Sequence, residues 1–157
     1  MDDLFGLKAT GPRRKVKFNP KPPIPDASWS KDNEFPDLSH CKAISIDLEV
    51  KDPGIDSFGP GWGRGVGHII GAAVGTDDGW SHYYPMRHED EGHDNYQPSK
   101  VLAYLTEQLG RDHQKKVGWN MTYDLGWLAE EGVPVVGPLW DGRIAEKLLD
   151  FFHADRS

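Results

Sequence analysis

The chain has 157 residues, of which 37% are hydrophobic, and a formal net charge of −7. A chain of this length suits one domain and can bury a core. It contains no apolar run that approaches the roughly 20 residues of a membrane span, and its N-terminus lacks the apolar stretch of a signal peptide. We therefore expect a cytoplasmic protein that does not bind a membrane.

The charge is unevenly distributed along the chain. Residues 1–36 contain seven Lys or Arg against five Asp or Glu, a net charge of +2. Residues 37–157 contain eleven against twenty, a net charge of −9. Broad electrostatic adhesion to nucleic acid requires clustered cations that displace counterions, and the acidic body argues against it.

Residues 1–36 are predicted to be a basic, proline-rich tail, extended or disordered. Six prolines interrupt any periodic pattern there, and residues 13–17 form a short basic run, Arg-Arg-Lys-Val-Lys. The alternative is an arm that contacts nucleic-acid phosphates or a protein partner. The domain proper is expected over residues 37–157.

The first predicted strand, residues 43–49, ends in two acids. Asp47 and Glu49 are two positions apart, so a strand sends both to one face, about 7 Å apart along its axis. Mg²⁺ and Mn²⁺ prefer oxygen ligands, and two such ions about 4 Å apart can activate a water and stabilise a leaving oxygen in phosphodiester cleavage. The pair is a candidate metal platform, although a solvated strand edge explains most such pairs. Cys41, just before the strand, is the single cysteine, and core packing is its expected role.

The next elements are predicted from turn residues and periodicity. The Gly- and Pro-rich residues 52–67 are expected to be a flexible connection. Residues 68–74 and 80–84 are predicted strands joined by a hairpin at Asp77-Asp78-Gly79. A helix is expected over about residues 98–110, where leucines are spaced by three and four: Leu102, Leu105 and Leu109.

A second polar motif follows a predicted strand at residues 115–119. A helix is expected from Asn120 to about Glu131, and Asn120 and Asp124 then share one helical face. Taken singly, Asn120 is explained as a helix N-cap, Asp124 as a first-turn acid and Tyr123 as core. A short strand near residues 135–140 and a helix from Asp141 through Phe152 complete the pattern, with Asp141 as the helix cap.

Together, Asp47-Leu48-Glu49 and Asn120-Met121-Thr122-Tyr123-Asp124 resemble the first and second motifs of the 3′–5′ proofreading exonucleases, Asp-x-Glu and Asn-x-x-Tyr-Asp. The resemblance is closest to the exonuclease domain of family A DNA polymerases, particularly phage ones, and spans roughly residues 36 to 155. It implies an α/β fold, a ribonuclease-H-like mixed sheet with flanking helices. It also implies work on DNA in the cytoplasm of a bacterial or phage-infected cell.

The resemblance assigns roles to individual residues. Two ions, Mg²⁺ or Mn²⁺, would be held by the catalytic carboxylates Asp47, Glu49 and Asp124. The 3′ end of a single-stranded DNA would be contacted by Leu48 through its backbone, by Asn120 and by Tyr123. An acid at the position of Asp141 is common in the family without being a core ligand, so Asp141 is a possible outer-shell contributor.

The chain departs from the family at its end. These exonucleases carry a third motif, Tyr-x-x-x-Asp, but no tyrosine follows Tyr123 and the sequence ends at Ser157. We therefore expect a domain incomplete at its C-terminus, with a polymerase domain or a second polypeptide carrying the third motif as its partner. The last helix would leave an apolar face, involving Leu148, Phe151 and Phe152, for that partner to cover. The alternatives are a noncatalytic nucleic-acid or replisome-binding remnant with the same fold, and more distantly an α/β domain with a coincidental acid pair.

Overall fold

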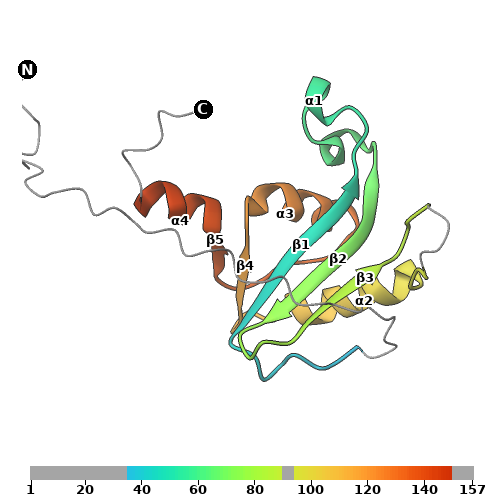
Figure 1. The fold of residues 1–157 in the computed structure, drawn as a ribbon. Coiled ribbons are helices and arrows are strands. Elements are labelled where there is room, and N and C mark those ends of the chain that lie inside the picture. Colours follow the sequence, from blue (N-terminus) through green and yellow to red (C-terminus); the bar gives the residue numbers. More distant parts are fainter. Residues whose placement is uncertain (1–34, 90–93, 150–157) are drawn as a thin grey trace, which may run out of the picture. The chain divides into compact units, whose positions relative to one another are not determined.

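The computed structural model describes residues 35–89 and 94–149 (Figure 1). The chain divides into two compact units, residues 1–32 and 33–157, and the first lies outside the described residues. The predicted tail therefore stays a prediction over residues 1–34. Phe35 belongs to the body, because its ring stacks on Tyr84 with centroids 5.2 Å apart and packs against the core.

The body is built on a mixed five-stranded sheet with the order β3-β2-β1-β4-β5. Strands β1 (Ala43–Lys51), β2 (His68–Thr76) and β3 (Ser81–Pro85) are antiparallel neighbours. Strands β4 (Lys115–Gly118) and β5 (Leu139–Asp141) add on the other side of β1, parallel to it and to each other. This arrangement confirms the predicted ribonuclease-H-like mixed sheet with flanking helices.

Helices α2 (Pro98–Leu109) and α3 (Met121–Glu130) lie behind the sheet in the view of Figure 1. Alternation along β1 explains why they lie there, since the strand buries every second side chain: Ile44, Ile46 and Leu48. These residues join one core with the buried faces of the two helices. Cys41 is 5% exposed in the same core, which confirms its predicted packing role. Helix α4 (Gly142–Leu149) follows β5 directly.

The connection between β1 and β2 is more ordered than its sequence suggested. It contains the one-turn helix α1 (Ile55–Phe58) and the 3₁₀ turn η1 (Gly61–Arg64). Trp62 of this turn lies so close to α3 that a Cβ added at Gly126 would be 2.3 Å from the indole. Glycine in α3 permits this close approach, and the predicted flexibility of the connection stays a prediction.

Lys116 ties the β4–β5 end of the sheet together from inside. Its side chain is fully buried, and its ammonium group donates to the carbonyls of Arg111 (2.6 Å), Gln114 (3.1 Å) and Val136 (2.9 Å). Burial, with the nearby charge of Arg111, lowers the pKa of Lys116. Three carbonyl acceptors offset part of the cost of removing the ammonium group from water. Within the described residues, no helix is both long and apolar enough to cross a membrane.

Candidate active site at the carboxyl end of β1

Asp47 and Glu49 project from the open side of β1. The strand alternates between buried and exposed residues, and both acids fall in the exposed set. Their partners across the antiparallel ladder are Ala73 and Gly71 of β2. The strand therefore presents the two carboxylates on one face, as the sequence predicts, while Leu48 between them is buried.

Helix α3 brings Asp124 to the same strand. Asp124 is 5% exposed, and its Oδ1 accepts a hydrogen bond from the backbone N–H of Leu48 at 3.3 Å. Burial, and to a smaller extent the negative charges of Asp47 and Asp141, outweigh the bond from Leu48 and raise the pKa of Asp124 to about 6. The two motifs, 76 positions apart at Leu48 and Asp124, thus meet at one place.

Glu49 is placed differently from Asp47. Its charge acts on Tyr83 of β3, whose pKa is raised first by burial and then by Glu49. In the described part of the chain, the carboxylate oxygens of Asp47, Glu49 and Asp124 do not all lie within 4.8 Å of one another. The charge of Asp47 thus acts on Asp124 of α3, and the charge of Glu49 acts on Tyr83 of β3.

Asn120 lies at the turn between β4 and α3. It takes a left-handed backbone conformation, with φ of 59°, that asparagine tolerates better than most residues. It occupies the N-cap position, but its side chain makes no capping bond. Its side-chain oxygen instead accepts a hydrogen bond from Nη1 of Arg143 at 2.7 Å, which brings a cation to this end of the site.

Asp141 does the capping for two helices. Its carboxylate accepts from the backbone N–H groups of Asn120 (3.0 Å) and Met121 (2.8 Å) at the start of α3, and from that of Arg143 (2.9 Å) in α4. Burial pushes the pKa of Asp141 up, but these backbone donors together outweigh it and hold that pKa below its usual range. The predicted cap of the last helix is present, and the cap of α3 was not expected.

Tyr123 is held by the connection that follows β1. Its hydroxyl donates to Oδ2 of Asp52 at 2.9 Å, and the same oxygen accepts from the backbone N–H of Gly61 at 3.0 Å. Burial raises the pKa of Tyr123, and the bond to Asp52 adds to that increase. Tyr123 therefore links α3 to the loop that borders the two strand carboxylates.

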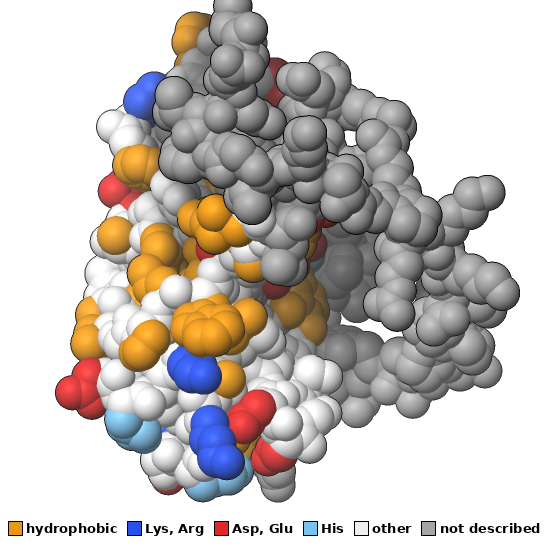
Figure 2. Space-filling view, turned by 90° about the vertical axis from the view of Figure 1, so that its left-hand side faces the viewer, with side chains coloured by type: hydrophobic (Ala, Val, Ile, Leu, Met, Phe, Trp, Pro, Cys, Tyr) orange, Lys and Arg blue, Asp and Glu red, His pale blue; other side chains and the backbone are white. Residues whose placement is uncertain are grey.

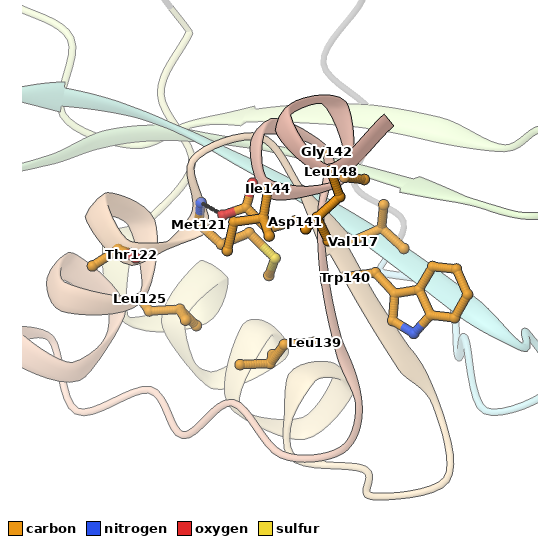
Figure 3. Close-up of a pocket in the computed structure, with 11 residues that line it drawn as sticks. Val117, Met121, Thr122, Leu125, Leu139, Trp140, Asp141, Gly142, Ile144 and Leu148 are labelled. Atoms are coloured by element: carbon orange, nitrogen blue, oxygen red, sulfur yellow. Dashed lines mark hydrogen bonds between the residues drawn. The ribbon is translucent and has the colours of Figure 1, made fainter. Parts of the chain in front are cut away.

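An apolar groove of about 440 Å³ opens beside Asp141, between α3, β5 and α4 (Figure 3). Four of its lining side chains are at least half exposed: Leu139, Trp140, Ile144 and Leu148. Figure 2 faces this side of the molecule and shows hydrophobic side chains gathered there. Lys115 lies over the Trp140 ring, 4.6 Å from its centroid. The predicted exposure of Leu148 is confirmed, whereas Phe151 and Phe152 lie outside the described residues.

Known proteins resemble this chain in sequence and in fold. No protein-family model matches it. Over 133 residues it is 37% identical to a DNA-directed DNA polymerase of Pseudomonas phage M6. The matched region covers 79% of this chain and 20% of the polymerase. The chain thus spans about a fifth of the length of that polymerase.

Solved structures of the nuclease NrnC from Brucella melitensis share the fold. The structure with pGG bound has a TM-score of 0.50 and that with Mg²⁺ bound a TM-score of 0.51. Each is 20% identical in sequence to this chain, and each match covers 77% of this chain. The matches cover 51% of the NrnC chain with pGG bound and 52% of the NrnC chain with Mg²⁺ bound. The chain therefore has the fold of these NrnC structures and is related in sequence to a phage DNA polymerase, which confirms the resemblance read from its two motifs.

Proposed function

We propose that this chain is the first part of a 3′–5′ proofreading exonuclease module of a DNA polymerase, which removes 3′-terminal nucleotides from single-stranded DNA ends. The observation that carries the proposal is the bond from Leu48 N–H to Asp124, which joins the second motif to the strand between Asp47 and Glu49. The polymerase relative and the nuclease fold support the same activity. The module would act in the cytoplasm of a bacterial or phage-infected cell.

The donors suit Mg²⁺ or Mn²⁺. Asp47, Glu49 and Asp124 offer only carboxylate oxygens, the ligands that hard divalent cations prefer. Burial and the charge of Asp47 already disfavour the ionised form of Asp124, and a cation between them would relieve that repulsion. When bound, a pair of such ions supplies an activated water and charge stabilisation for phosphodiester hydrolysis.

The chain's own groups would position the substrate. Leu48 fixes one oxygen of Asp124 through its N–H and leaves the other for a ligand. Asn120 and Tyr123 would contact the terminal nucleotide, and Arg143, bonded to Asn120, would meet a phosphate. A paired end must unstack before it can reach these groups, so frayed and mispaired ends would be cut preferentially.

Completion of the site would require a Tyr-x-x-x-Asp helix from a polymerase domain or a second polypeptide. The exposed apolar groove beside Asp141 is a surface that such a partner would cover. Without the third motif, the second ion and the water would each lose a ligand, and positioning is most of the catalysis in such sites. We therefore expect the isolated chain to be a poor nuclease.

A time course on a 5′-labelled single-stranded oligonucleotide tests the proposal. The chain mixed with the third-motif polypeptide should shorten the oligonucleotide stepwise from the 3′ end in Mg²⁺ or Mn²⁺. Asp47→Ala should abolish shortening, whereas the control Asp112→Ala, at an acid whose side chain is 88% exposed, should not. Vigorous shortening by the isolated chain would refute the need for a partner, and activity retained in Asp47→Ala would refute the site.

A noncatalytic nucleic-acid or replisome-binding remnant is the second candidate. It is favoured by the electrostatics of Glu49, whose charge acts on Tyr83, whereas the charge of Asp47 acts on Asp124. Such a module would bind the labelled oligonucleotide in a fluorescence-anisotropy titration and would leave it intact with every partner and metal. The Asp47→Ala variant would bind the oligonucleotide as well as the unchanged chain does.

A further inference from the structure

A second group of metal-binding side chains lies at the opposite end of β1. His40 and Cys41 precede the strand, and Asp78 lies in the turn between β2 and β3. His40 Nε2, Cys41 Sγ and a carboxylate oxygen of Asp78 all lie within 4.8 Å of one another. Cys41 and Asp47 are six positions apart, roughly 20 Å along an extended strand, so this group is separate from the acidic site.

Two of the three separations between these atoms match a tetrahedral metal, and the third, from Cys41 Sγ to Asp78, is within 4.8 Å. His40 Nε2 lies 3.5 Å from Cys41 Sγ and 3.5 Å from Asp78 Oδ2. Bonds from zinc of about 2.3 Å to sulfur and about 2.0 Å to nitrogen and oxygen, at a tetrahedral angle, require separations of about 3.5 Å and about 3.3 Å. One ion could therefore contact all three atoms with small side-chain adjustments.

The surrounding structure already orients the ligands. Thr76 Oγ1 and the backbone N–H of Trp80 donate to Oδ1 of Asp78, which leaves Oδ2 facing His40. The neighbouring Asp77 accepts from the backbone N–H groups of Lys42 (3.0 Å) and Ala43 (3.3 Å) and so ties the turn to the start of β1. Outer contacts of this kind fix ligand geometry in metal sites.

Cys41 is held from the core side. Its backbone N–H donates to the carbonyl of Leu38 at 3.0 Å, and its own carbonyl accepts from Nε2 of Gln114 at 2.8 Å. His40 and Asp78 have side chains 66% and 52% exposed, so an ion from solvent can reach the thiol past them. The group therefore combines one buried thiol with two exposed ligands, which a solvated His–Asp pair alone would not provide.

We propose that His40, Cys41 and Asp78 bind one Zn²⁺-class transition-metal ion, with its fourth coordination position open to water or a ligand. Thiolate and imidazole donors favour zinc or cobalt over Mg²⁺, which prefers oxygen. Burial, followed by the charges of Asp78 and Asp77, raises the pKa of the Cys41 thiol, so binding would release the thiol proton to solvent. The ion would join residues 40–41 to the β2–β3 turn.

Cobalt titration of the full, reduced chain tests this site. One Co²⁺ per chain should produce thiolate-to-cobalt charge-transfer absorption, lost on adding chelator or excess Zn²⁺ but not on adding excess Mg²⁺. Cys41→Ser should remove that absorption. His40→Ala and Asp78→Asn, at exposed positions where the fold should persist, should each weaken cobalt binding about 10- to 100-fold.

His113→Ala is the matched control, because His113 also faces an aspartate, Asp112, at 3.9 Å. It should bind cobalt, and give the same charge-transfer absorption, as the unchanged chain does. A thermal-unfolding midpoint that rises with Zn²⁺ in the unchanged chain and not in Asp78→Asn would support the proposal independently. Absence of charge-transfer absorption, or absorption unaffected by His40→Ala and Asp78→Asn, would overturn it.

Discussion

Two neighbouring units, β4–α3 and β5–α4, each consist of a parallel strand followed by a helix, but the first helix is packed in the core and the second is exposed. Each parallel strand leads directly into its helix, and Asp141 caps both helices. Helix α3 buries Trp127 and Leu128 completely, whereas Ile144 and Leu148 of α4 are 57% and 75% exposed. The contrast indicates that α3 is anchored in the core, whereas the described part of α4 presents apolar side chains at the surface.

The largest loss of stability should come from removing the buried Trp127 side chain of α3. Trp127→Ala should lower the free energy of unfolding by about 3–5 kcal/mol, because it opens a cavity in the core that the surrounding side chains fill only in part. Trp140→Ala in β5, a tryptophan 59% exposed, is the matched control and should cost under about 1 kcal/mol. Urea denaturation measures both, and equal losses would contradict the contrast between the units.

A smaller loss of stability is expected from replacing Lys116, the buried lysine of β4. Lys116→Met should destabilise the chain by about 2 kcal/mol, because it leaves three carbonyls without their ammonium donor. Lys115→Met, one residue earlier at an exposed position, should leave the unfolding midpoint nearly unchanged. A stabilised Lys116→Met variant would mean that the buried ammonium group costs more than its three bonds return.

Asp124 should make stability depend on pH. Its pKa is raised from 3.8 to about 6 in the folded chain, so the folded state binds more protons than the unfolded state between about pH 4 and 6. The free energy of unfolding should therefore fall across that interval by about 2 kcal/mol as Asp124 ionises. Asp124→Asn should remove most of this decline and be the more stable protein at pH 8. Denaturation at pH 4, 6 and 8 checks it, and parallel curves would refute the assignment.

The smallest effect on folding is expected on the open face of α4. Leu148→Ser should change the free energy of unfolding by less than about 0.5 kcal/mol, because the side chain is 75% exposed. The same substitution should weaken association with the polypeptide that carries the third motif. Calorimetric titration of that polypeptide distinguishes the two roles, and unaltered affinity would show that α4 is not the contact surface.

Local periodicity predicted much of the fold and part of the site. The alternation in β1, the Asp-Gly turn of the hairpin and the leucine spacing of α2 are short-range signals, and each element appeared near its predicted bounds. Asp124 bonds to the backbone of Leu48, the residue after Asp47, and the assignment of Asp47 and Asp124 to one metal site stays a prediction. The elements and the two separate motifs were accessible because each depends on a few neighbouring residues.

The missed features depend on contacts between distant residues. The docking of Trp62 against Gly126 and the bond from Arg143 to Asn120 join segments that no periodicity relates. Asp141 was predicted to cap the helix that follows it, but its bonds to the start of α3, 20 positions earlier, require the β4–β5 pairing. Cys41 was assigned to the core from its position alone, since its proximity to Asp78 exists only once the β2–β3 turn folds back.

Manganese binding by the isolated chain tests the central claim most directly, because it requires neither DNA nor a partner. Titration with Mn²⁺, followed by electron paramagnetic resonance of the free ion, should reveal a weak site that Asp47→Asn and Asp124→Asn each abolish. Asp78→Asn, at the opposite end of β1, should leave that binding unchanged. Equal Mn²⁺ binding by the unchanged chain and by Asp47→Asn and Asp124→Asn would contradict the proposal that these carboxylates form the metal site of an exonuclease.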